Sequence, residues 1–209
     1  MRIRITFSKS GPMQYVGHLD LHRAWERTFR RSGLPLEYSQ GFHPQPHLNL
    51  ACALPVGFTS QCELLDAWLQ QDLLLEQILK HIAAALPPGL KIAGIVSVDD
   101  HAPALQTQVS AAIYCITFLD EIPDLVDRVE KIVTAEKLPR TRRDKPYDLR
   151  PLVESITLLT HWDGNLVTIR AQLAAREGAT GRPEELLDEM GVKFENTRVH
   201  REQLVLAPA

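Results

Sequence analysis

Cysteine is scarce in this sequence, and the positions of the three that occur exclude two kinds of site. Cys52, Cys62 and Cys115 share no spacing typical of zinc ligands, and three cysteines in a chain of 209 residues do not make a disulfide framework. We therefore expect three buried thiols, no metal centre built on cysteine, and no cofactor.

Long apolar runs and a strong net charge are also missing. No segment approaches the roughly 20 apolar residues that a membrane-spanning helix needs, and no signal peptide precedes the first expected strand. We therefore expect a cytoplasmic protein with no membrane partner. The formal net charge of -3 is close to neutral, which excludes a molecule-wide field that would attract nucleic acid.

The basic residues that do occur are gathered in two segments. Residues 1–47 contain seven Lys or Arg against three acidic residues, and residues 137–151 contain six against two. The remaining acids lie mostly elsewhere along the chain. The surface is therefore expected to be polarised, so that parts of it can follow a phosphate backbone.

The first basic segment includes an expected amphipathic helix over residues 18–32. Its apolar residues, among them Leu21, Trp25 and Phe29, follow the spacing of one helix face, and Gly33 ends the helix. Cations late in a helix also interact favourably with its dipole, which is a purely structural explanation for some of the arginines that follow. The opposite, solvent-facing side is expected to carry Arg23, Arg27, Arg30 and Arg31.

A loop rich in aromatic, amide and imidazole groups follows this helix. Such side chains stack on bases or hydrogen-bond to them when they lie beside arginines. Aromatic residues in an extended segment are also consistent with core packing. The loop residues that we expect to contact bases are Tyr38, Gln40, Phe42, His43 and His47.

The second basic segment, residues 138–150, contains too much proline to be a helix. It is either a solvated hairpin arm or an arm that grips RNA, with its arginines on phosphates and Tyr147 available to stack. The basic residues of this arm that we expect to contact RNA are Arg140, Arg142, Arg143, Lys145 and Arg150.

Histidines supply the material for a different function. His18 and His22 are one helical turn apart, a spacing that can place two imidazoles on one metal, with His43 as a candidate third ligand. An exposed histidine pair on a basic helix is the more ordinary explanation, so no metal is expected. If these residues and His47 were instead functional, they would indicate a small histidine-dependent nuclease or a metal-dependent hydrolase.

The expected elements occur in the order strand, helix, strand, strand, helix, strand in each half of the chain. In the first half, strands are expected at 2–8, 36–38 with 48–54, 61–69 and 90–98, and helices at 18–32 and 73–86. In the second half, strands are expected at 111–119, 152–160, 165–173 and 194–206, and helices at 122–135 and from 182. A hairpin turn is expected at Asp163–Gly164, and the helix at 122–135 is expected to turn inward Val126, Val129, Ile132 and Val133.

This order predicts an α+β protein made of two tandem ferredoxin-like (βαββαβ) units, with antiparallel sheets and helices on one face. The first unit is expected to span 1–103, with the basic helix and the loop, and the second 104–209, with the basic arm. Residues 99–108 are polar enough to include a linker. We expect the helix, the loop and the arm to surround a shared cleft.

The run from Tyr15 to Glu63, YVGHLDLHRAWERTFRRSGLPLEYSQGFHPQPHLNLACALPVGFTSQCE, resembles the radical-SAM-linked proteins, an uncharacterised bacterial family. The resemblance continues more weakly through residues 147–151 to Arg201. Members of that family are fused to radical SAM enzymes or encoded near them, so the resemblance implies such an enzyme as a partner. It supplies no catalytic residues. The cysteine triplet of a radical SAM enzyme is absent, so this chain is not that catalyst.

Together these features predict an RNA-binding, substrate-presenting module for tRNA or rRNA that acts with a radical SAM enzyme in RNA modification. The RNA part rests on the basic and aromatic residues, and the enzyme partner on the resemblance. We expect a binding module rather than an enzyme. The histidine-dependent nuclease or hydrolase is one alternative function, and a protein-interaction domain whose arginines meet an acidic partner is another.

Overall fold

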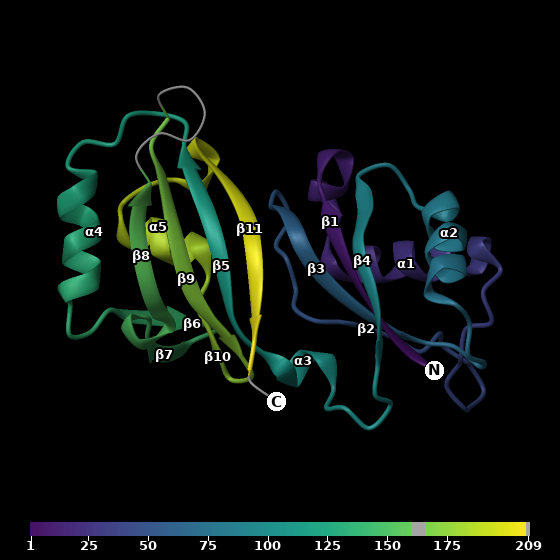
Figure 1. The fold of residues 1–209 in the computed structure, drawn as a ribbon. Helices are drawn as coiled ribbons and strands as arrows, with labels where there is room; N and C mark the ends of the chain where they lie inside the picture. Colours follow the sequence, from purple (N-terminus) through teal and green to yellow (C-terminus); the bar gives the residue numbers. More distant parts are fainter. Residues whose placement is uncertain (160–165, 208–209) are drawn as a thin grey trace. The chain divides into compact units, whose positions relative to one another are not determined.

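The computed structural model describes residues 1–159 and 166–207. These residues form five α-helices and mostly antiparallel β-sheet, so the protein has a mixed α/β fold (Figure 1). The chain divides into two compact units, of which unit 1 is Met1–Gln108 and unit 2 is Val109–Ala209. Within the described ranges, no helix is both long enough and apolar enough to cross a membrane.

Unit 1 is built on an antiparallel sheet with helices between its strands. Its elements are β1 (Arg2–Lys9), a 3-10 turn (Gly11–Tyr15), α1 (His18–Ser32), β2 (Leu48–Leu50), β3 (Thr59–Trp68), α2 (Leu75–Ala85), β4 (Leu90–Val98) and α3 (Leu105–Gln108). The strands lie in the order β2-β3-β1-β4, and each neighbouring pair is antiparallel.

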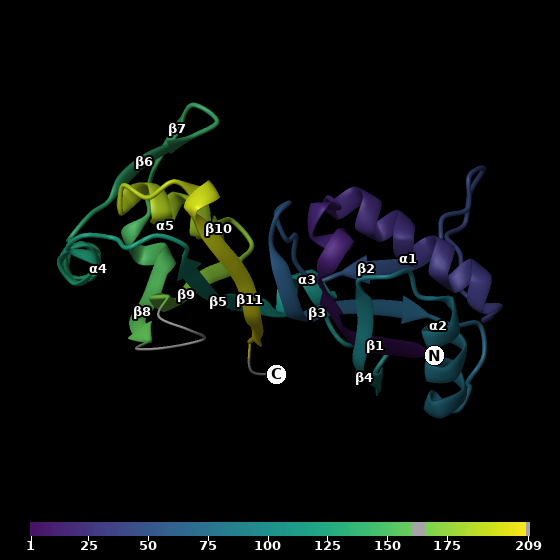
Figure 2. The same ribbon diagram turned by 90° about the horizontal axis from the view of Figure 1, so that it is seen from above.

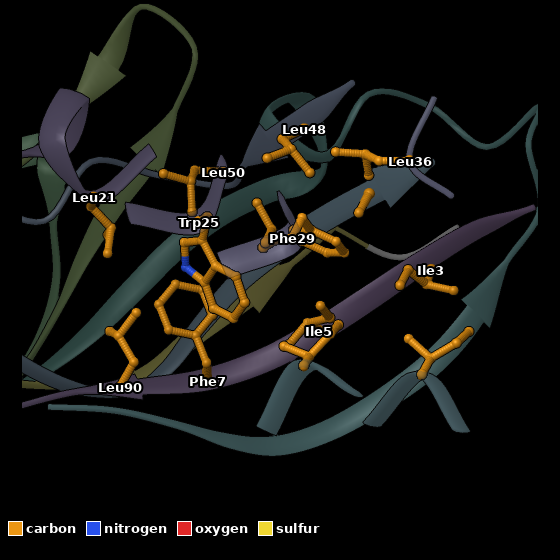
Figure 3. Packing of buried hydrophobic residues seen from close by; sticks show 14 of the residues in the cluster. Ile3, Ile5, Phe7, Leu21, Trp25, Phe29, Leu36, Leu48, Leu50 and Leu90 are labelled. Carbon is orange, nitrogen blue, oxygen red and sulfur yellow. The ribbon is translucent and has the colours of Figure 1, made fainter. Parts of the chain in front are cut away.

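The core of unit 1 lies between this sheet and the two longer helices. On β1, the alternate residues Ile3, Ile5 and Phe7 share one face and are fully buried. The buried residues of α1 and α2 belong to the same cluster, so both helices cover that face. Trp25 of α1 lies at the centre, with its ring 4.8 Å from Phe7 in an edge-to-face arrangement (Figure 3).

Helix α1 confirms the prediction from the apolar spacing, with the same bounds of 18 and 32. Leu21, Trp25 and Phe29 are buried, as a single apolar stripe requires. Gly33 follows with a φ of 68°. This left-handed conformation is open to glycine at little cost because glycine has no Cβ, which explains why the helix ends there.

Unit 2 repeats the succession of strands and helices and adds a hairpin. Its elements are β5 (Val109–Phe118), α4 (Leu125–Thr134), β6 (Pro139–Arg142), β7 (Lys145–Asp148), a 3-10 turn (Arg150–Leu152), β8 (Val153–Leu159), β9 (Thr168–Arg176), β10 (Ala179–Thr180), α5 (Pro183–Glu189), a 3-10 turn (Phe194–Asn196) and β11 (Thr197–Leu206). The main strands lie in the order β8-β9-β5-β11, all antiparallel. Among the described residues, strands β6 and β7 pair only with each other. The turn predicted at Asp163–Gly164 lies outside those residues.

The inward face predicted for α4 is partly wrong. Val129 and Ile132 are buried as expected, but Val126 and Val133 are 60% and 42% exposed. The helix begins at Leu125 rather than at residue 122. Leu125, Val129 and Ile132 then form the stripe at intervals of four and three residues, which leaves the other two valines beside it.

The strands predicted at 36–38 and 48–54 are shorter in the structure. Leu36 and Tyr38 each form only an isolated bridge, to Leu69 and Pro46. Strand β2 ends at Leu50, although Leu54 is only 3% exposed. Leu54 is therefore buried without belonging to a ladder, and its apolar character produced the longer prediction.

Two further expectations need correction. Cys52, Cys62 and Cys115 are half-buried rather than buried, and burial together with the neighbouring Glu202 raises the pKa of the Cys115 thiol to about 11. Residues 99–108 are not an open linker. Arg2 donates hydrogen bonds to carbonyls within this segment, and α3 occupies its end.

Candidate nucleic-acid interface

The outer face of α1 carries the four arginines that the sequence predicts to be exposed. Arg23, Arg27, Arg30 and Arg31 are all exposed, because the opposite face is fixed in the core. Arg23 lies 3.1 Å from Asp20 in a surface ion pair, and Arg31 donates to the carbonyl oxygen of Ala85 at 2.6 Å.

Arg27 and Arg30 differ from their two neighbours. Neither guanidinium has an ion-pair or hydrogen-bond partner among residues 1–159 and 166–207. Two positive charges three residues apart on one helix are therefore held toward solvent without internal compensation. These are the side chains of α1 best placed to meet an external anion.

The segment after α1 forms a finger that is closed by backbone hydrogen bonds. The amide of Glu37 donates to the carbonyl of Trp68, the amide of His47 to that of Glu37, and the amide of Ser39 to that of Gln45, each at 2.8 Å. Figure 2 shows that this segment, which connects α1 to β2 along the chain, projects from unit 1. The finger, residues 37–47, therefore has a fixed base although it is not a regular strand pair.

The tip of the finger is exposed. Phe42 has a relative exposure of 103% and Tyr38 of 39%, and Gln40 and His43 are exposed as well. The Phe42 ring is therefore not used in the core and is accessible to another molecule. The structure thus places Tyr38, Gln40, Phe42 and His43 on one projection.

The base of the finger rests on a stack that the sequence analysis missed. The ring of His47 stacks on that of Trp68 with centroids 3.8 Å apart and planes 6° from parallel. The Arg2 guanidinium lies 4.9 Å from the Trp68 ring, and Arg2 and Arg4 both bind the carboxylate of Asp66. His47 is therefore part of the support of the finger.

A signal for this support was present in the sequence. Arg2 and Arg4 alternate with Ile3 and Ile5, so they share the strand face that the core does not use. In the sheet, Arg4 lies opposite Asp66. The alternation indicated the face but not the partner, because β3 is distant in sequence.

A groove separates the finger from the first half of α1. It has a volume of about 520 Å³ and is lined by Leu19, His22, Arg23, Glu26, Ser39, Gln45, Pro46, His47, Leu48 and Asn49. The helix and the loop that the sequence singled out are thus brought together. Tyr38, Gln40, Phe42 and His43 do not line this groove.

One imidazole is fixed inside the groove. Nδ1 of His22 lies 3.1 Å from an oxygen of Glu26, and Nε2 lies 3.3 Å from the carbonyl oxygen of Leu48. Both neighbouring oxygens are acceptors, so a neutral ring donates its one N–H to one of them and lies against the other. In the described part of the chain, no group of three His, Cys, Asp or Glu residues is arranged to hold a metal ion, so His18, His22 and His43 are not brought together as ligands.

The predicted basic arm is a hairpin in unit 2. Strands β6 and β7 pair from Pro139 opposite Asp148 to Arg142 opposite Lys145. The turn residues Arg143 and Asp144 have positive φ values of 50° and 62°, which matches the twist of a tight two-residue hairpin. Proline at Pro146 is tolerated because this two-stranded sheet has only edge strands.

Two arginines of the arm are compensated internally. Arg140 pairs with Asp188 and, at 2.9 Å, with Glu189. Arg142 donates through Nε to Glu185 at 2.9 Å. The hydrogen bond to Glu185 raises the pKa of the Arg142 guanidinium. The acidic helix α5 thus neutralises this part of the arm, and the sequence analysis did not foresee it.

The other arm residues divide into two kinds. Arg143 and Lys145 are exposed at the tip and have no ion pair within the described ranges. Arg150 lies at the base and donates to the carbonyl oxygens of Val153 and Val133, each at 2.8 Å. Only the tip of the arm therefore presents uncompensated positive charge.

Comparison with known proteins assigns the chain to a family. The model of the family described as uncharacterized protein conserved in bacteria (DUF2344) matches residues 2–183, which is most of the sequence. The chain belongs to this family. A search of curated proteins gives no significant match.

Several solved structures resemble the chain at low sequence identity. They include the archaeal box H/ACA sRNP Nop10–Cbf5 complex, with 13% identity and a TM-score of 0.42 over 99% of this chain and 47% of that one. A Cbf5–Nop10–Gar1 complex is 12% identical, with a TM-score of 0.47 over 99% of this chain and 48% of that one. A putative glycine cleavage system transcriptional repressor is 11% identical, with a TM-score of 0.25 over 91% of this chain and 88% of that one. The chain spans about half the length of the first two. Similarity at these values identifies no shared function.

Proposed function

We propose that this chain is an RNA-binding, substrate-presenting module for tRNA or rRNA that acts with a radical SAM enzyme in RNA modification. The observation that carries the RNA part is the pair Arg27 and Arg30, exposed and uncompensated on α1 beside a finger with an exposed Phe42 at its tip. Guanidinium groups bind phosphates, and aromatic rings and amides contact unpaired bases. The two kinds of group lie on one unit.

The arginines and the finger have separate roles in this proposal. Arg23, Arg27, Arg30 and Arg31 contact phosphates and set the position of the RNA, which gives affinity without sequence preference. Tyr38, Gln40, Phe42 and His43 contact bases. His47 supports the finger through its stack on Trp68.

The arm of unit 2 has a smaller part. Arg143 and Lys145 at its tip are available for phosphates without breaking an ion pair to any residue that the structure describes. Arg140, Arg142 and Arg150 reach RNA only by exchanging the internal partners described above, at a cost of about 1.5–3 kcal/mol for each hydrogen bond to a charged group. The proposal therefore ranks the tip above the rest of the arm.

Each unit is proposed to be ferredoxin-like. The strand orders β2-β3-β1-β4 and β8-β9-β5-β11 are antiparallel throughout, as the βαββαβ plan requires. We take the two units, Met1–Gln108 and Val109–Ala209, as the corresponding domains, with a boundary a few residues later than the expected 103/104. Sheets of this kind bind RNA in some proteins, but function is carried by the residues at the site and not by the fold.

The partner enzyme has a different basis. It rests on the resemblance of residues 15–63 to the radical-SAM-linked proteins. In this proposal the enzyme supplies the chemistry and the present chain holds the RNA. The test of the partner is co-purification of the two proteins from a bacterial extract treated with nuclease, which separates a direct protein contact from one bridged by RNA.

The RNA part is tested by binding of purified protein to total bacterial tRNA and rRNA across a salt series. The wild-type affinity is expected to fall steeply with salt because phosphate contacts release counterions. Arg27→Glu/Arg30→Glu is expected to lose at least about tenfold in affinity and to lower the salt slope by about 1.4, the value for two contacts to a single strand.

The matched control is Lys193→Glu/Arg198→Glu, which makes the same change in net charge at exposed positions of unit 2. If the two double variants weaken binding equally, the effect is one of overall charge and the α1 site is wrong. If the wild-type protein binds neither RNA at low salt, the RNA function itself is wrong, and an acidic protein partner for the arginines becomes the better hypothesis.

A further inference from the structure

The groove between α1 and the finger has the size and the lining of a site for one small ligand. Its volume of about 520 Å³ falls in the range of ligand clefts, roughly 300–1,000 Å³. Leu19, Pro46 and Leu48 give it apolar contact surface. The groove cannot be recognised in the sequence, because the helix and the loop meet only in the folded unit.

Three polar groups of the groove have unused hydrogen-bonding capacity. One oxygen of Glu26 is engaged by His22 at 3.1 Å, while the other has no partner among the described residues. The side-chain amide of Gln45 also lacks a partner within those ranges. The hydroxyl oxygen of Ser39 accepts from the backbone amide of Gln45 at 3.0 Å, which leaves its proton free to donate.

Contacts around the groove hold the Glu26 carboxylate and the Ser39 hydroxyl in place. The imidazole of His22 is fixed between Glu26 and the carbonyl of Leu48, and it orients the carboxylate. The two hydrogen bonds between Ser39 and Gln45 close the finger at the mouth of the groove. The groove thus offers a fixed acceptor, a hydroxyl donor, and an amide that both donates and accepts.

We infer that this groove binds one unpaired nucleotide of the RNA. A base needs donors and acceptors at its edge and apolar contact on its faces, and both are present. Arg23 lines the rim, with Arg27 and Arg30 farther along the same helix, so the phosphates on either side of the inserted nucleotide meet positive charge. This inference rests on the proposed RNA function and names the part of the RNA that the module selects.

Selection of unpaired RNA follows from the hydrogen-bonding groups that line the groove. A base in a duplex uses its edge for pairing and cannot enter, whereas an unpaired base can be turned out of the strand. The groove therefore favours single-stranded over paired RNA. Tyr38 and Phe42, at the exposed part of the finger, contact the neighbouring bases instead.

The test compares an unstructured oligoribonucleotide of about eight nucleotides with a blunt duplex that contains the same strand, at about 50 mM salt. The measured quantity is the ratio of the two affinities, because general electrostatic effects act on both. The wild-type protein is expected to prefer the single strand. Gln45→Ala and Glu26→Gln are each expected to lower this ratio about fivefold, the effect of one hydrogen bond.

Matched controls make the same chemical changes on α2, where Gln77→Ala and Glu76→Gln alter exposed residues away from the groove. Circular dichroism and thermal unfolding verify that all four variants fold. The inference is overturned if RNA binds but the groove variants keep the wild-type ratio; the proposed RNA function then stands. If the protein binds neither RNA, the groove inference and the proposed RNA function are both overturned. That result is expected if the groove binds a peptide instead of a nucleotide.

Discussion

The two basic segments look alike in sequence and differ in how their charges are used. On α1 of unit 1, Arg27 and Arg30 extend into solvent with no internal partner in the described residues. On the β6–β7 arm of unit 2, Arg140 and Arg142 are bound to the acidic side chains of α5. Two of the four α1 arginines thus keep their charge available, whereas Arg140 and Arg142 of the arm use theirs in contacts within the fold.

This difference shows that a run of basic residues indicates a binding surface only after its internal partners are known. The formal charge of a segment counts arginines but not the carboxylates that the fold brings to them. An arginine already bound to a carboxylate must give up that contact before it binds a phosphate. Stability and binding experiments therefore separate the two segments.

The largest effect on stability is expected at Asp66, which pairs with Arg2 and Arg4. These two arginines of unit 1 have an internal partner among the described residues, unlike Arg27 and Arg30 of the same unit. Asp66 has no exposed side-chain surface and binds Arg2 and Arg4 at 2.6 and 2.7 Å. Asp66→Ala leaves the buried guanidinium of Arg2 and the half-buried one of Arg4 without their carboxylate. The free energy of unfolding is therefore expected to fall by about 3–5 kcal/mol. Urea denaturation measures it.

The control for this change is Asp72→Ala, at a carboxylate whose side chain is 92% exposed. It is expected to leave the midpoint of denaturation almost unchanged. Equal losses in the two variants would mean that the buried cluster does not stabilise unit 1.

The second effect concerns the arm. Arg142→Ala removes the hydrogen bonds to Glu185 and to the carbonyl of Thr180, and the stacking over the Tyr147 ring at 4.7 Å. The free energy of unfolding is expected to fall by about 1.5–3 kcal/mol, measured by denaturant titration. Lys145→Ala, opposite Arg142 in the hairpin, is the control and should change it by no more than about 0.5 kcal/mol. A similar loss in both would show that the internal pairing is not what distinguishes the arm.

A smaller effect is expected from pH at the base of the arm. Asp148 accepts hydrogen bonds from the backbone amides of Leu138 and Arg150 at 2.8 and 3.0 Å, and these bonds lower the pKa of its carboxyl below 3.8. Because the folded pKa is below the unfolded one, the stabilisation is present above pH 3.8 and is lost as the pH falls through the folded pKa.

The measurement is the stability difference between the wild-type protein and Asp148→Asn as a function of pH. The difference should be constant near neutral pH and shrink below pH 3.8. A difference that does not depend on pH would rule out the charged form of Asp148 as the source of the stabilisation.

The smallest effect on stability is expected at the arginines proposed to bind RNA. Arg27→Ala/Arg30→Ala should change the free energy of unfolding by no more than about 0.5 kcal/mol, because both side chains are exposed and alanine is a good helix former. Thermal unfolding measures it. A loss as large as that of Arg142→Ala would abolish the contrast between the two segments.

The sequence predicted the regular elements where a local pattern was strong. Helix α1 and strand β4 have the predicted bounds, since apolar periodicity and Gly33 act within a few residues of the element that they define. The apolar pattern gave a wrong prediction at Leu54, which is buried although it belongs to no strand. It was also wrong for the buried face of α4, because the helix begins later than predicted and leaves Val126 and Val133 exposed.

The candidate site was predicted only in part. The exposure of the four helix arginines and of Phe42 follows from their places opposite a buried stripe and in a loop with several prolines. The stack of His47 on Trp68 and the groove beside His22 and Glu26 were missed. Both depend on how the finger packs against β3 and α1, and the sequence of the finger does not predict that packing.

By itself, the sequence determined the helices, most of the strands and the gathering of basic residues into two segments, because these depend on neighbours along the chain. Only the tertiary structure decided which arginines remain available. Arg142 meets Glu185 across 43 residues, and Arg2 meets Asp66 across 64. Two charges pair only if they are close in space, and the packing of apolar faces sets that distance. A count of charges along the chain therefore cannot predict which of them pair.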